Sequence, residues 1–109
     1  MKQFLLVILF CLLSITFVMA DTITLLVATT DADQSNTFTV LKNEVIPVIF
    51  TGTVGSGETG DIQIWDGAAW VSDSTQLTDT ELIRVVVGPG LFRVDKSATA
   101  AAAGIAVSR

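Results

Sequence analysis

Beyond residue 20 the chain alternates apolar and polar residues with a period of two, and turn-forming residues interrupt the alternation at intervals of about eight to twelve positions. The alternation is clear in residues 22–30 and 61–65. It predicts strands, because successive side chains of a strand point to opposite faces of a sheet. Many short strands at this spacing are typical of two packed sheets. We therefore predict an all-β fold, a small antiparallel β-sandwich of Ig-like or jelly-roll-like type, formed by residues 21–109.

The first twenty residues differ in composition and are predicted to form an N-terminal hydrophobic helix. Lys2 supplies a positive charge, residues 4–13 are uniformly apolar, and Ala20 is a small residue of the kind that a signal peptidase reads. A membrane-spanning helix requires about 20 apolar residues. This length favours a signal peptide cleaved before Asp21, with a retained membrane anchor as the alternative. Both interpretations predict an exported protein that is extracellular or lies on a cell surface or virion surface, with membrane contact only through residues 1–20 if they are uncleaved.

The side-chain inventory excludes several classes of function. The chain has 11 acidic and 6 basic residues, no His and no Tyr, and its one cysteine is Cys11. Nucleic acid is a poor partner for such a chain, because phosphate binding needs a clustered basic face. Most transition-metal sites and the usual catalytic bases and nucleophiles need imidazole, thiol or phenol groups. We therefore predict a protein that is not an enzyme and has no cofactor and no metal site.

A glycine-rich segment has the spacing of a dinucleotide-binding motif. Gly55, Gly57 and Gly60 form a GxGxxG pattern, which in a dinucleotide-binding unit is followed by a helix whose N-terminus holds the pyrophosphate. Here residues 61–65 are predicted to form a strand, and Glu58 would repel phosphate. We therefore favour a flexible loop over a nucleotide site.

A second segment has the alternating oxygen ligands of a calcium-binding loop. Asp31, Asp33 and Ser35 occupy the first, third and fifth positions of such a loop. The sixth position is Asn36 where glycine is required, and the twelfth is Lys42 where a bidentate glutamate is required. We therefore favour a solvated turn between strands, with weak calcium binding through a different type of loop as the alternative.

Asp66-Gly67 is the strongest turn signal in the chain, because it supplies the positive φ angles that a tight hairpin needs. The loop comprises either these two residues or the four residues from Asp66 to Ala69. Both lengths place Trp65 and Trp70 on the same face of the hairpin, within reach of each other.

The two tryptophans are the candidate interaction residues. Large aromatic side chains on a sheet usually bury their surface, so a position in the core or in a subunit interface is favoured for Trp65 and Trp70. A ligand platform for sugar stacking is the alternative. The opposite face of the hairpin is also apolar, which suits strands covered by a neighbouring subunit. Its residues are Ile62, Ile64, Ala69 and Val71.

Two further patterns predict how strands are placed. Pro47 interrupts an apolar segment at residues 45–53, and proline cannot donate to a ladder, so this strand is predicted at a sheet edge or at a bulge. Residues 82–87 and 91–94 flank Gly-Pro-Gly at positions 88–90. We predict a second hairpin about this turn.

The segments TITLLVATT, FTV, IQIWDGAAWV and GPGLFRVDKSATAAAAGIAVS resemble, in this order, a class of small phage-associated β-sandwich proteins that act as structural components. The resemblance covers residues 21–109 and is carried by turn chemistry. It implies a non-catalytic structural subunit of a virion surface, appendage or extracellular filament, which packs against further copies or other structural subunits. The alternative is a secreted module that binds a glycan or a host surface through Trp65 and Trp70.

Overall fold

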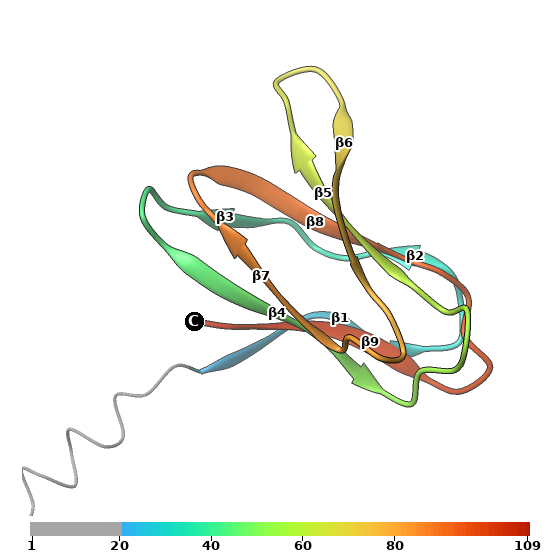
Figure 1. Cartoon of the computed structure of the whole chain (residues 1–109). Helices are drawn as coiled ribbons and strands as arrows, with labels where there is room; N and C mark the ends of the chain where they lie inside the picture. Colours follow the sequence, from blue (N-terminus) through green and yellow to red (C-terminus); the bar gives the residue numbers. More distant parts are fainter. Residues whose placement is uncertain (1–20) are drawn as a thin grey trace, which may run out of the picture.

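A computed structural model describes residues 21–109, and the predicted signal or anchor segment 1–20 lies outside the described residues. The described chain consists of strands joined by turns and loops and contains no helix, so the all-β prediction is confirmed (Figure 1). The strands are β1 (Thr22–Thr29), β2 (Asp33–Gln34), β3 (Phe38–Val40), β4 (Val45–Gly52), β5 (Gly60–Trp65), β6 (Trp70–Leu77), β7 (Ile83–Val87), β8 (Gly90–Lys96) and β9 (Ala103–Ser108).

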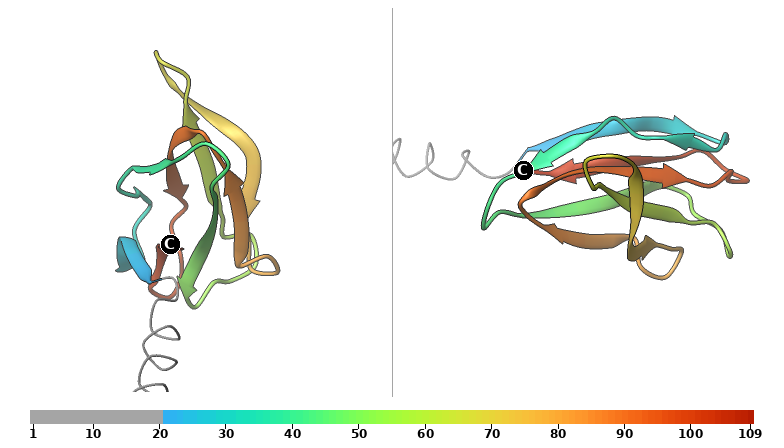
Figure 2. Two further views of the ribbon diagram at one scale, coloured as in Figure 1. Left: turned by 90° about the vertical axis from the view of Figure 1, so that its left-hand side faces the viewer. Right: turned by 90° about the horizontal axis from the view of Figure 1, so that it is seen from above.

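The strands form two antiparallel sheets. The four-stranded sheet has the order β1-β9-β4-β7. The five-stranded sheet has the order β2-β8-β5-β6, and β3 also pairs with β8. Figure 2 shows β1, β9, β4 and β7 side by side, with β7 as the outermost strand of its sheet. Every pairing is antiparallel, as predicted.

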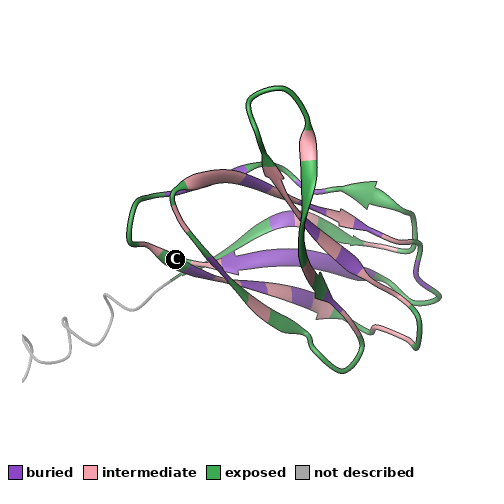
Figure 3. Ribbon diagram, turned by 45° about the horizontal axis from the view of Figure 1, so that its top comes forward, coloured by how far each residue is buried: buried purple, intermediate pink, exposed green. Residues whose placement is uncertain are grey.

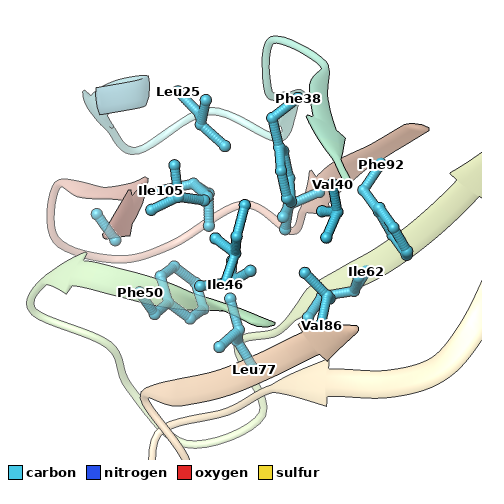
Figure 4. Packing of buried hydrophobic residues seen from close by; sticks show 14 residues of the cluster. Leu25, Phe38, Val40, Ile46, Phe50, Ile62, Leu77, Val86, Phe92 and Ile105 are labelled. Carbon is cyan, nitrogen blue, oxygen red and sulfur yellow. The ribbon is translucent and has the colours of Figure 1, made fainter. Parts of the chain in front are cut away.

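One hydrophobic core lies between the sheets (Figures 3 and 4). The alternation of β4 places Ile46, Val48 and Phe50 inward, and residues of the five-stranded sheet such as Ile62 and Phe92 face them. These side chains are at most 2% exposed. Their burial, at roughly 25 cal/mol per Å² of apolar surface, supplies the main driving force for folding.

The prediction that Pro47 places its strand at a sheet edge or at a bulge is wrong, because the strand lies inside its sheet and neither of its ladders has a register shift. Strand β4 is an inner strand, paired with β7 on one side and with β9 on the other. Pro47 lies opposite Val85 of β7, whereas the register with β9 begins one residue later, at Val48. The missing N–H therefore falls outside the ladder with β9, which is how an inner strand accommodates this proline.

The predicted second hairpin is also wrong. β7 pairs with β4 in the four-stranded sheet, whereas β8 pairs with β3, β5 and β2 in the other sheet. The Gly-Pro-Gly segment therefore carries the chain from one sheet to the other. A side chain at Gly88 would overlap the carbonyl oxygen of Leu41, so this crossing also needs a residue without Cβ.

Strand β1 departs from the regular alternation predicted for residues 22–30. Its register with β9 shifts between Thr24 and Leu26 and again between Leu26 and Thr29. Leu25 is buried in the core, but Val27, two positions along, is 75% exposed. Bulges of this kind move following side chains to the other face.

Candidate functional site

The β5–β6 hairpin projects beyond the body of the two sheets (Figure 1). Its loop comprises four residues, because Trp65 and Trp70 are direct cross-strand partners. The Asp66 carboxylate accepts hydrogen bonds from the N–H groups of Ala69 (2.7 Å) and Ala68 (2.8 Å), and these bonds lower the pKa of Asp66. Gly67 has a φ of 103°, which confirms the predicted positive φ.

The two indoles lie on the same face of the hairpin, as predicted. Their ring centroids are 5.5 Å apart and their planes are inclined by 59°. Trp65 is 38% exposed and Trp70 is half-buried, and neither belongs to the hydrophobic core. The core interpretation of these residues is therefore wrong, and they remain candidates for an interface or a ligand platform.

An arginine from a neighbouring strand completes this surface. The guanidinium carbon of Arg93 lies 4.4 Å from the centroid of the Trp70 ring. Arg93 Nε donates to Gln63 Oε1 at 2.7 Å, and Nη1 donates to Gln34 Oε1 at 3.1 Å. We call Trp65, Trp70, Arg93, Gln63 and Gln34 the aromatic surface. Stacking and two hydrogen bonds hold the guanidinium in one orientation on the outer face of the five-stranded sheet.

Sequence reasoning missed three of these residues. Alternation along β5 already places Gln63 on the face of Trp65. Arg93 joins them because it is the register partner of Gln63, and Gln34 because β2 pairs with the same strand, β8. These pairings join residues about 30 and 59 positions apart, so no local pattern could reveal them.

The opposite face of the hairpin divides into a buried base and an exposed tip. Ile62 is fully buried and Ile64 packs partly against the core. Val71, closer to the loop, is 45% exposed. The apolar residues at the base of the hairpin therefore pack into the domain's own core. Those at the tip of the hairpin remain exposed.

A second surface lies on the outer face of the four-stranded sheet. Three cross-strand pairs join β4 and β7 there, and Ile83, Val85 and Val87 of β7 are 59%, 55% and 60% exposed. We call this set the apolar stripe. It comprises Val45, Pro47, Ile49, Ile83, Val85 and Val87.

The four-stranded sheet carries almost no charge. Its four strands contain a single ionisable side chain, Arg84, which alternates with the stripe and lies on the opposite side of β7. The strands of the five-stranded sheet include six: Asp33, Asp61, Asp73, Arg93, Asp95 and Lys96. Residues 21–109 hold all 11 acidic residues and 5 of the 6 basic ones, a net charge of 5 − 11 = −6. The negative charge thus lies on the other sheet and in the loops.

The glycine-rich loop is held by hydrogen bonds to a carboxylate of the same chain. Glu58 accepts hydrogen bonds from the N–H of Gly55 (2.6 Å) and of Ala100 (2.7 Å), which lower the pKa of Glu58. The carboxylate thereby links the connection between β4 and β5 to the connection between β8 and β9.

The segment that resembles a calcium loop also forms hydrogen bonds within the chain. The carbonyl oxygen of Asp31 accepts a bond from the buried Lys96 ammonium at 2.7 Å. Ser35 Oγ accepts from the N–H of Val94, and one Asp33 carboxylate oxygen accepts from the N–H of Gln34. Within residues 21–109 no group of three or more metal-ligating side chains comes together.

Over the described range, 21–109, no helix has the length and apolar character needed to cross a membrane. Comparison with protein-family models, with curated proteins and with solved structures finds no match to this chain.

Proposed function

We propose that the protein is a non-catalytic structural subunit of a virion surface, appendage or extracellular filament, and that it self-assembles through the apolar stripe. In this proposal residues 1–20 direct export, and the domain is an Ig-like or jelly-roll-like β-sandwich. The observation that carries the proposal is the exposed run of β-branched side chains on β7, paired with the apolar residues Val45, Pro47 and Ile49 of β4. Contiguous exposed apolar surface on a small domain is typical of a protein interface.

The distribution of charge supports a second copy of the same chain as the partner. Two copies of residues 21–109, each with a net charge of −6, repel each other through most of their surfaces. The outer face of the four-stranded sheet is the exception, since its strands direct no charged side chain outward. Contact there buries apolar surface without bringing like charges together.

Sedimentation of the full chain, expressed with export and purified as produced, tests the proposal. We expect concentration-dependent association of the wild-type protein. Val85→Glu should weaken it roughly tenfold or more, because a carboxylate would be desolvated without a partner in the interface. Val71→Glu is the matched control, with the same substitution at a similarly exposed valine of the hairpin.

A wild-type protein that stays monomeric over the whole concentration range would contradict the proposal. Association that is weakened by Val71→Glu and unchanged by Val85→Glu would move the interface to the hairpin.

The aromatic surface favours a second candidate function, binding of a glycan on a host or cell surface. Trp65 and Trp70 offer apolar ring faces beside fixed guanidinium and amide groups. This combination suits a sugar, which presents C–H faces to aromatic rings and hydroxyl groups to polar side chains. Both tryptophans of the chain belong to this surface.

Intrinsic fluorescence therefore reports on the aromatic surface alone. Titration with chitohexaose and cellohexaose should shift or quench the emission in a saturable way if the surface binds such glycans. The same titration of Arg93→Met should require roughly thirtyfold more sugar, since two hydrogen bonds of about 1 kcal/mol each would be lost. Unchanged emission with both sugars would reject the candidate.

A further inference from the structure

We infer that the self-association proceeds by strand pairing: β7 of one copy adds antiparallel to β7 of a second copy, with Val85 on the two-fold axis. This inference rests on the proposed function and specifies its contact. It follows from which edge strands are regular and unpaired on one side, and this observation is independent of the apolar stripe.

Strand β7 pairs with a neighbouring strand of its sheet along one side only. It pairs with β4 over five consecutive residues, from Ile83 to Val87, without a register shift. On its other side no strand within residues 21–109 pairs with it. The outward N–H and C=O groups of an edge strand are a template for another strand.

The other edges of the two sheets are interrupted or short. β1 has two register shifts. β6 has a shift opposite Asp61–Gln63 and includes Ser74 at a φ of 62°. β2 and β3, which share the remaining edge, have two and three residues.

Bulges and shortness are devices by which proteins prevent edge-to-edge pairing. β7 has no register shift and no proline, and only Ile and Val lie on its outer face. Its one feature of this kind is the charge of Arg84, which lies on the inner face. Among the edges within residues 21–109, β7 is therefore the one suited to accept a strand.

Symmetry and the length of β7 together set the register of the pairing. A two-fold axis normal to the sheet pairs one residue of β7 with its own copy and keeps the same faces aligned. With the central residue, Val85, on the axis, all five residues of β7 have partners. Ile83 then stands opposite Val87, and β-branched pairs of this kind stabilise a sheet. Arg84 stands opposite Val86 in this register, so the two arginines are not placed directly against each other.

The register also gives the stripe residues of β7 apolar neighbours on a second flank. Ile83, Val85 and Val87 have apolar neighbours from β4 on one flank. In the dimer they gain matching neighbours on the other flank, and the two four-stranded sheets become one continuous eight-stranded sheet.

Disulfide formation by a single introduced cysteine tests this contact. The background is the full chain with Cys11→Ala, so the introduced thiol is the only one. Across an antiparallel pair, Cα atoms are about 4.5–5.5 Å apart, within the disulfide range of about 4.4–6.8 Å. Sheets stacked face to face lie about 10 Å apart and are outside this range.

We expect Val85→Cys to form covalent dimers at least roughly tenfold faster than Val27→Cys under mild oxidation, because pairing raises the local thiol concentration. Val27 is a matched control: it is a more exposed valine, at 75%, on the opposite edge strand of the same sheet. The double variant Ile83→Cys/Val87→Cys should cross-link faster than either single variant, since the register places these residues opposite each other.

Sedimentation of the same samples separates the two levels of the proposal. Association of wild-type protein, combined with equal cross-linking rates for Val85→Cys and Val27→Cys, would overturn strand pairing and leave the structural role in place. Strictly monomeric behaviour with no preferential cross-linking would overturn both.

Discussion

At the scale of single residues, the features predicted correctly are those set by neighbours in sequence. The Asp66-Gly67 turn is an example, because the carboxylate binds N–H groups two and three positions along the chain. Lys96 is a counterexample. It is 1% exposed, and its ammonium donates to the carbonyl oxygens of Asp31 and Ser97. A contact spanning 65 positions leaves no local pattern, so this lysine could not be distinguished from a surface residue.

Gly67→Val should destabilise the domain by about 1 kcal/mol or more, because a β-branched residue resists a positive φ. A Cβ at this position would meet no atom within 4 Å, so the effect would be conformational and not steric. Urea unfolding followed by circular dichroism measures it. Ala68→Val, in the same loop, is the control, and an equal midpoint for the two variants would contradict the assigned turn.

Glu58 should contribute stability that depends on pH. Its pKa in the folded state is lowered below the usual 4.5, chiefly by the N–H of Gly55 and then by that of Ala100. A lowered folded pKa means that the contribution is fully present above the unfolded value and is lost as the pH falls through the folded value. The urea midpoint should therefore drop as the pH decreases below about 4.5, and less steeply in Glu58→Gln. Asp79→Asn removes a charge from an exposed turn as the control; an identical acid profile for Glu58→Gln and wild type would contradict this role.

At the scale of elements, the strands themselves were predictable and their partners were not. Alternation and turn residues mark β5 and β6, and a short loop makes them a hairpin. β7 and β8 carry the same local signals around Gly-Pro-Gly, yet they belong to different sheets. Local geometry allows both outcomes, and burial of Val86 and Phe92 in one shared core decides between them. Likewise, Pro47 predicts that β4 lacks one hydrogen bond to a neighbouring strand. The sequence does not show which of its two neighbours this is.

The position of the hairpin tip outside the core predicts unequal effects of two aromatic substitutions. Trp65→Ala should cost about 0.5–1.5 kcal/mol, the value of an aromatic pair. Phe50→Ala should cost about 3–5 kcal/mol, because Phe50 is 2% exposed and its loss leaves a cavity. Urea unfolding followed by circular dichroism compares them. Equal destabilisation would show that the hairpin is part of the cooperative core.

At the scale of the whole molecule, the chain places different chemistry on its two outer faces. Composition shows the net negative charge. It does not show that one sheet holds six charged strand residues while the other holds only Arg84, because this separation depends on which strands share a sheet. The uncharged sheet carries the apolar stripe and an open, regular edge. The charged sheet carries the aromatic surface. The proposed assembly uses the four-stranded sheet, and the aromatic surface on the five-stranded sheet stays free for a ligand.

Hydrogen exchange of the wild-type protein at low and high concentration tests association through β4 and β7 without any substitution. If copies associate through the side formed by β4 and β7, amide protection should rise with concentration in Ile83–Val87. It should stay constant in β1 and at the tip of the β5–β6 hairpin. Protection of β7 that does not change with concentration, or a rise confined to the hairpin, would rule out association through β7.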